Sequence, residues 1–117
     1  MSINEKVIRE ALDAYNARDV DRLVSCMAPD AVLLDGLGNQ TIKGRENIRE
    51  TEGRAFDHSP RLHAEITARI ATGKYVVTEE HVTGINLDRY PAEAHLVVVY
   101  RIEDGKITRA QSFNTET

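Results

Sequence analysis

Apolar residues near the N-terminus recur at the spacing of an α-helix. The stripe consists of Ile3, Val7, Ile8, Ala11, Leu12 and Tyr15. This spacing predicts an amphipathic helix, which Ser2 or Asn4 can cap. The pattern breaks after Tyr15, and Asp19 then has the position of a cap for a second, shorter helix that ends at Pro29.

The middle of the chain combines a short strand pattern with a third helix. Residues 31–34 are all apolar and predict a strand. Asp35 and the glycine-rich turn at 36–38 come directly after this strand. Residues 45–56 predict a helix with Ile48, Ala55 and Phe56 turned inward. Gly53 weakens the far end of this helix.

The rest of the chain has the alternating pattern of β-strands. Strands are predicted over residues 62–70, 75–85, 93–102 and 107–113. Asp104-Gly105 is a typical two-residue hairpin turn. Strands joined by hairpins form a mostly antiparallel sheet, and helices gathered early in the sequence are expected to cover one face of it. The prediction is a single α+β domain over residues 1–117, with a curved sheet wrapped around the N-terminal helices.

Composition narrows the class of protein and its partners. The chain is 41% hydrophobic and 29% charged, which is typical of a soluble globular protein. Its net charge of −4 argues against nucleic acid as a partner, because nucleic-acid binding needs a basic surface. No apolar run has the length of a membrane span or a signal peptide, so we expect no membrane association and a cytoplasmic location. The single cysteine, Cys26, is expected to be a buried hydrophobe.

Four short segments carry a family resemblance. They are YNARDVD at 15–21, DAVLLDGLG at 30–38, KGRENI at 43–48 and VVYRIEDGKI at 98–107. In this order and spacing they resemble the nuclear-transport-factor-2-like superfamily, and within it the SnoaL-like and ketosteroid-isomerase-like branch. The resemblance covers nearly the whole chain. It implies a cone-shaped domain with a pocket between the helices and the concave face of the sheet, and many such domains dimerise.

The resemblance places Asp35 where ketosteroid isomerases carry their general base. In those enzymes an Asp removes a proton beside a ketone, while a Tyr and a protonated Asp bind the enolate oxygen. In this chain Ala11 and Val98 stand at the positions of the two donors. Without those donors the enolate loses much of its stabilisation, so standard ketosteroid isomerase activity is not expected.

Candidate site residues follow from the strand patterns. Asp35 is the candidate base, and its alternative role is to bond the backbone of the adjoining turn. Glu79 and His81 alternate onto one face of their strand, which is either the pocket face or the solvated outer face. The resemblance points Val98 into the pocket, and Tyr100 shares its face.

Further candidates complete the predicted site. Tyr100 or His81 is predicted to polarise a ligand oxygen while Asp35 acts as acid or base. The predicted ligand-binding residues are Tyr15, Glu79, His95, Val98 and Phe113. The four histidines lack the spacing of a helical two-histidine site, so no metal is expected. The glycines match no phosphate-binding pattern, and no cofactor is expected.

Three functions remain open from the sequence. The first is an isomerase or cyclase type of enzyme that uses a pocket carboxylate on a small apolar carbonyl compound. The second is a binding domain that holds a small apolar molecule without chemistry. The third is a dimerising module whose cone is filled by side chains. Val97 and Val99 point away from the predicted pocket, and such an apolar outer face predicts a homodimer through the convex side of the sheet.

Overall fold

Three helices and six strands make up the fold in the computed structural model, which describes residues 1–115. In chain order they are α1 (Ile3–Asn16), α2 (Val20–Ser25), β1 (Met27–Leu34), β2 (Gln40–Lys43), α3 (Arg45–His58), β3 (His63–Thr72), β4 (Tyr75–Thr83), β5 (Ala94–Glu103) and β6 (Lys106–Asn114). The predicted α+β class is confirmed.

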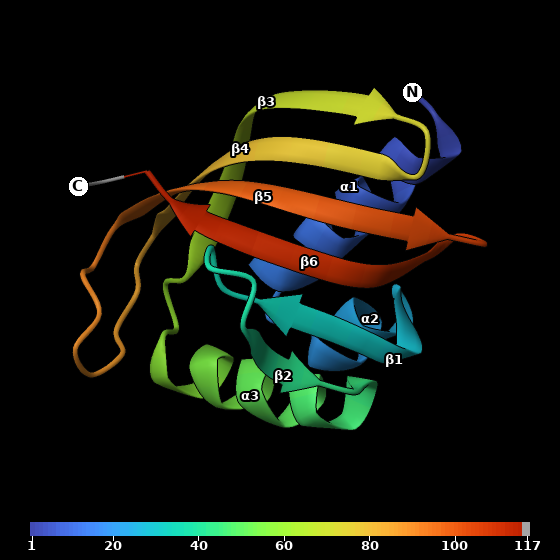
Figure 1. Cartoon of the computed structure of the whole chain (residues 1–117). Helices are drawn as coiled ribbons and strands as arrows, with labels where there is room; N and C mark the ends of the chain where they lie inside the picture. The colour runs from blue at the N-terminus through green and yellow to red at the C-terminus, as the bar shows by residue number, and fades with distance from the viewer. Residues whose placement is uncertain (116–117) are drawn as a thin grey trace.

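The strands form one curved sheet in the order β2-β1-β6-β5-β4-β3. β1 and β6 pair in parallel, whereas the other neighbouring strands are antiparallel. Figure 1 shows the three helices gathered on one side of this sheet. The buried core lies between the helices and that concave face, with Ile48 of α3 packed in the same cluster as Val76 of β4.

Both N-terminal helices begin at the predicted caps. The Ser2 side chain accepts a hydrogen bond from the Glu5 backbone N–H, and the Glu5 side chain accepts one from the Ser2 N–H. This reciprocal capping box stabilises the first turn of α1. Asp19 caps α2 by accepting from the Arg22 N–H. Among the described residues, no helix is long and apolar enough to cross a membrane.

The first strand is longer than its sequence pattern predicts. β1 begins at Met27, ahead of the apolar run at 31–34, and it contains Pro29. Its pairing with β6 shifts register between Met27 and Val32, so the proline falls in an irregular part of the ladder, where a missing N–H is tolerated. β2 was not predicted, because its four residues have no clear alternation and depend on pairing with β1.

A bulge in β3 interrupts the simple alternation that the sequence predicts over residues 62–70. Ile66 pairs with Glu80, but Ala68 pairs with Glu79, so Thr67 is an extra residue. One inserted residue moves the following side chains to the opposite face. Ile70 accordingly lies on the outer face opposite Val77 and is 66% exposed.

Candidate functional site

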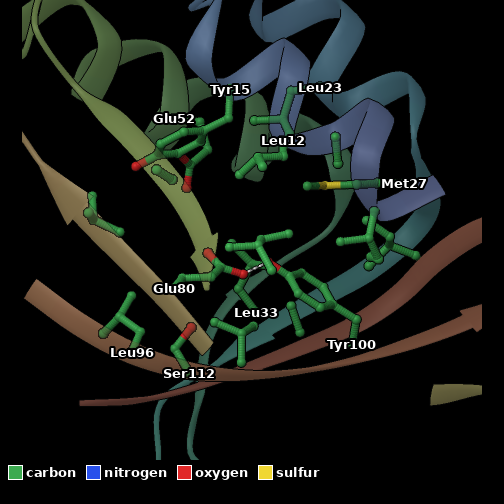
Figure 2. Close-up of a pocket in the computed structure, with 18 residues that line it drawn as sticks. Leu12, Tyr15, Leu23, Met27, Leu33, Glu52, Glu80, Leu96, Tyr100 and Ser112 are labelled. Carbon is green, nitrogen blue, oxygen red and sulfur yellow. Dashed lines mark hydrogen bonds between the residues drawn. The ribbon is translucent and has the colours of Figure 1, made fainter. Parts of the chain in front are cut away.

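A cavity of about 260 Å³ lies between the helices and the concave face of the sheet. Figure 2 shows side chains from α1, α3 and the strands converging on it. Its lining is apolar except for Tyr15, Glu52, Glu80, Tyr100 and Ser112. Within the described part of the chain, no Lys, Arg or His side chain lines it. The two carboxyl groups therefore face a cavity without a cationic partner.

Glu80 is a buried carboxylate held by two hydroxyl groups. Its side chain is on β4, and the residue is only 7% exposed. The Oε2 atom accepts a hydrogen bond of 2.6 Å from Thr78 Oγ1 and one of 2.7 Å from the Tyr100 hydroxyl. A buried charged group needs such partners to offset its lost hydration. These bonds fix the Glu80 side chain inside the cavity.

The strand register explains why Glu80 points inward. Glu80 pairs with Leu96 and Thr78 pairs with Val98 across β4 and β5. Paired residues on antiparallel strands share a face, so Glu80 lies on the same side of the sheet as these apolar lining residues. Glu79 and His81, its chain neighbours, consequently point to the outer face.

Tyr100 is a hydrogen-bond donor at neutral pH. Burial raises the pKa of its phenol well above the ordinary value, and the negative charge of Glu80 raises it further. The phenol therefore keeps its proton and donates a hydrogen bond to Glu80. Figure 2 shows this bond as a dashed line at the centre of the cavity.

Glu52 is the second carboxyl group of the cavity. It lies on α3 between Ile48 and Phe56 at a spacing of four residues, so all three face the core. Within residues 1–115 no group forms a hydrogen bond or ion pair with its carboxylate. Burial raises the pKa of Glu52 from 4.5 to about 7. A carboxyl group with this pKa exchanges protons readily at neutral pH.

Tyr15 stands beside both carboxyl groups at the end of α1. Burial raises the pKa of its phenol, and the charges of Glu52 and then Glu80 raise it further. Its ring packs edge-on against Phe56, with centroids 5.3 Å apart and an interplanar angle of 81°. No described residue accepts a hydrogen bond from its hydroxyl. A ligand oxygen can therefore take that bond.

Asn16 positions this end of α1. Its side-chain Nδ2 donates to the Ala64 carbonyl at 2.9 Å, and its Oδ1 accepts from the Ala64 N–H at 2.8 Å. The two bonds attach the last turn of α1 to the start of β3. They hold the neighbouring Tyr15 in place over the cavity.

The structure places three of the predicted ligand contacts in the cavity lining. Tyr15, Val98 and Tyr100 all line it, although their roles in binding or catalysis stay predictions. Ala11 lines it as well, and together with Val98 it offers no hydrogen-bond donor. The predicted cone therefore contains a cavity and is not filled by side chains.

The expected position of Asp35 in the pocket is wrong. Asp35 is exposed on the connection between β1 and β2 and does not line the cavity. Its Oδ1 atom accepts hydrogen bonds from the backbone N–H groups of Leu37 at 3.0 Å and Asn39 at 3.2 Å. The chain leaves the sheet after Leu34, so the carboxylate caps the turn instead of facing the core.

Four other predicted contacts lie outside the cavity. Glu79 is exposed and accepts a hydrogen bond of 2.8 Å from the Thr67 hydroxyl. His81 and His95 stack on the outer face, and Phe113 is 37% exposed and packs against Gly36. The placement of these side chains in the pocket is corrected because strand alternation carries them to the opposite face of the sheet.

Sequence reasoning missed Glu52 and Glu80. The i, i+4, i+8 spacing of Ile48, Glu52 and Phe56 was a usable signal for Glu52. The inward position of Glu80 could be found only from the pairing register of β4 and β5. Strand alternation places Glu79 and Glu80 on opposite faces but does not say which of them faces inward.

Comparisons with known proteins agree on the family and fold. The family model of the SnoaL-like domain matches residues 8–110. An uncharacterized cystatin-fold protein of Novosphingobium aromaticivorans is 36% identical, with a TM-score of 0.85 over 96% of this chain and 97% of that one. No curated protein matches the chain significantly.

Other solved structures share the fold at lower identity. A putative polyketide cyclase of Sinorhizobium meliloti is 26% identical, with a TM-score of 0.77 over 92% of this chain and 93% of that one. A protein of Catenulispora acidiphila with a ketosteroid isomerase-like fold was solved in complex with trimethylamine. It is 22% identical, with a TM-score of 0.76 over 91% of this chain and 82% of that one.

Proposed function

Because the chain belongs to the family of SnoaL-like domains, we propose that it binds a small, mostly apolar carbonyl compound in the cavity and catalyses proton transfer on it. One observation carries the proposal. Glu52, whose pKa is raised to about 7, lines an apolar cavity together with Tyr15, whose hydroxyl is available to a ligand. A base and a donor in one apolar site are what enolisation requires.

The lining argues against an anionic ligand. Glu52 and Glu80 are its charged side chains, and no cation among the described residues lines the cavity. An anionic ligand, such as a phosphate or a carboxylate, would meet two acidic groups and no partner. The volume of about 260 Å³ lies below the range of about 300–1,000 Å³ for typical ligand pockets, which favours a ligand smaller than a steroid.

The proposed step moves one proton. The ionised Glu52 carboxylate takes a proton from the carbon beside the ligand carbonyl, and the electrons of that C–H bond shift to form an enolate. The Tyr15 hydroxyl donates a hydrogen bond to the enolate oxygen. Glu52 then returns the proton to the same carbon or to a conjugated one, so no other reactant is consumed.

Glu80 and Tyr100 orient the ligand in this proposal. Their mutual hydrogen bond is fixed by Thr78, which donates to the same carboxylate oxygen. The Glu80 carboxylate can accept a hydrogen bond from a hydroxyl group on the ligand. This arrangement differs from the standard isomerase, because Ala11 and Val98 stand at its donor positions and Tyr15 donates from another turn of α1.

Deuterium exchange tests the proposal directly. The protein is incubated in D2O with 2-tetralone, a small apolar ketone, and loss of the proton signals beside the carbonyl is followed by NMR. We expect exchange above the buffer rate and at least a tenfold loss in Glu52→Gln. Asp35→Asn is the matched control, since it makes the same chemical change on an exposed turn.

Each outcome of this experiment decides between the candidates. Loss of exchange in Asp35→Asn with full exchange in Glu52→Gln would return the base to Asp35 and overturn the assignment. Amide chemical-shift changes on adding 2-tetralone, without any exchange, would indicate a ligand-binding domain without catalysis. No exchange and no shift changes would contradict this ligand class.

A small tertiary amine is a second candidate ligand. Two carboxyl groups and the rings of Tyr15 and Tyr100 line the cavity, which is the chemistry that attracts an organic cation. The trimethylamine complex of the Catenulispora acidiphila protein supports this alternative. A titration with trimethylamine, in which Glu80→Gln weakens binding and Asp35→Asn does not, would favour it over the ketone.

A further inference from the structure

Two histidines and a glutamate meet on the outer face of the sheet. His81 of β4 and His95 of β5 are paired across the strands, and their rings stack with centroids 4.3 Å apart. Glu93 precedes β5, and its Oε1 lies 3.0 Å from His81 Nε2 and 3.6 Å from His95 Nε2. One donor atom from each residue lies within 4.8 Å of the other two.

We propose that this His81–Glu93–His95 cluster binds a divalent transition metal ion such as Zn²⁺. Two imidazoles and one carboxylate form a donor set that zinc uses while a fourth position stays open to water. Donors at about 2.0–2.1 Å from a tetrahedral ion stand roughly 3.4 Å apart. The spacings of 3.0 and 3.6 Å around Glu93 Oε1 are close to this value. The two rings are stacked within 5° of parallel, so one ring must turn on binding for both Nε2 lone pairs to point at the same ion.

The environment of His81 provides a second, independent observation. Its Nε2 atom is buried and has no hydrogen-bond partner among the described residues. Glu93 Oε1 therefore lies within hydrogen-bond distance of His81 Nε2, but the angle between them does not allow a hydrogen bond. A buried ring nitrogen without a well-directed hydrogen bond costs stability, and coordination of a metal ion would satisfy it.

The donors also select the kind of ion. Imidazole nitrogens suit zinc, cobalt, nickel and copper, whereas magnesium and calcium prefer oxygen ligands. The cluster lies on the opposite face of β4 from Glu80, so the proposed ion is separate from the cavity and its chemistry. The ion would link the end of β4 to the start of β5, on either side of the connection formed by residues 84–93. This link would stabilise that end of the sheet.

Metal titration tests the proposal on untagged protein. We expect calorimetry with Zn²⁺ to show one ion per chain, and Co²⁺ to give the visible absorption of a nitrogen-coordinated ion. His81→Gln and His95→Gln should each weaken zinc binding at least tenfold, and Mg²⁺ should not bind. His63→Gln is the matched control, because His63 is an exposed histidine outside the cluster.

Thermal unfolding adds a readout of structure. Excess Zn²⁺ should raise the Tm of the wild type and of His63→Gln but not that of His95→Gln. Circular dichroism establishes that each variant is folded. Equal zinc binding by the wild type and the His81→Gln/His95→Gln double variant, or no zinc binding by the wild type, would overturn the proposal and leave Glu93 as an ion-pair partner only.

Discussion

The Tyr100 hydroxyl donates a hydrogen bond of 2.7 Å to Glu80 Oε2 inside the cavity. The two residues are not register partners, since Tyr100 pairs with Val76 and Glu80 pairs with Leu96. Their long side chains reach toward each other over Thr78 and Val98, which form the pair between them. The bond joins the neighbouring strands β4 and β5 on the side where the proposed ligand binds.

Tyr100→Phe should destabilise the protein through the loss of this bond. Hydrogen bonds to charged groups contribute about 1.5–3 kcal/mol, and the buried Glu80 would keep only the Thr78 donor. Urea unfolding measures the change, and Tyr90→Phe is the control because Tyr90 is 67% exposed. A double-mutant cycle with Thr78→Val should show coupling, since both hydroxyls share one oxygen; additive losses would argue against a shared site.

Glu52 should make stability depend on pH below neutrality. The pKa of Glu52 is raised from 4.5 to about 7 in the folded chain, so the folded state binds more protons than the unfolded state between these values. Stability therefore falls as pH rises through this window, and the loss is complete above about pH 7. The total is on the order of 3 kcal/mol.

Glu52→Gln should remove this dependence. The unfolding free energy of the variant minus that of the wild type should increase from pH 4.5 to pH 7 and stay constant above pH 7. Glu65→Gln, which removes an exposed charge on β3, is the control and should not reproduce the trend. Parallel pH profiles of Glu52→Gln and the wild type would show that Glu52 is not protonated by burial.

Gly84→Ala should be strongly destabilising. Gly84 has a φ of +73°, and an added Cβ would stand 2.0 Å from the Arg61 carbonyl oxygen. Backbone atoms cannot yield as a side chain does, so we expect a loss of several kcal/mol, beyond the roughly 1–2 kcal/mol of a left-handed backbone alone. Gly73→Ala separates the two effects, because Gly73 has a φ of +56° and no neighbouring atom within 4 Å. Equal losses in chemical denaturation would refute the steric explanation.

The outer face of the sheet should form a homodimer. Ile70, Val77 and Val99 lie in one row across β3, β4 and β5, and Ile70 is 66% exposed. Covering such a row favours association of two copies. Light scattering at micromolar concentration should give twice 13.1 kDa. Val99→Lys should give the monomer mass, whereas Ile3→Lys, on the exposed face of α1, should not; a wild-type monomer would contradict the prediction.

The sequence alone determined most of the elements and much of the fold. Helical stripes and strand alternation depend on local spacing, so the cap at Asp19 and the hairpin at Asp104-Gly105 followed directly. The cap of α1 was narrowed to Ser2 or Asn4, and the structure shows Ser2. Four motif segments were sufficient to indicate the family. Tyr15, Val98 and Tyr100 were also expected at the pocket, since the family resemblance points Val98 inward and Tyr100 shares its face, and all three line the cavity.

Only the tertiary structure decided which polar groups enter the cavity. Asp35 follows an apolar strand, yet the turn after Leu34 carries it to the surface. Glu80 and Glu52 enter because the β4–β5 register and the packing of α3 turn them inward. The same register brings His81 against His95. Such pairings join residues far apart in the chain, and local periodicity does not contain the register that sets them.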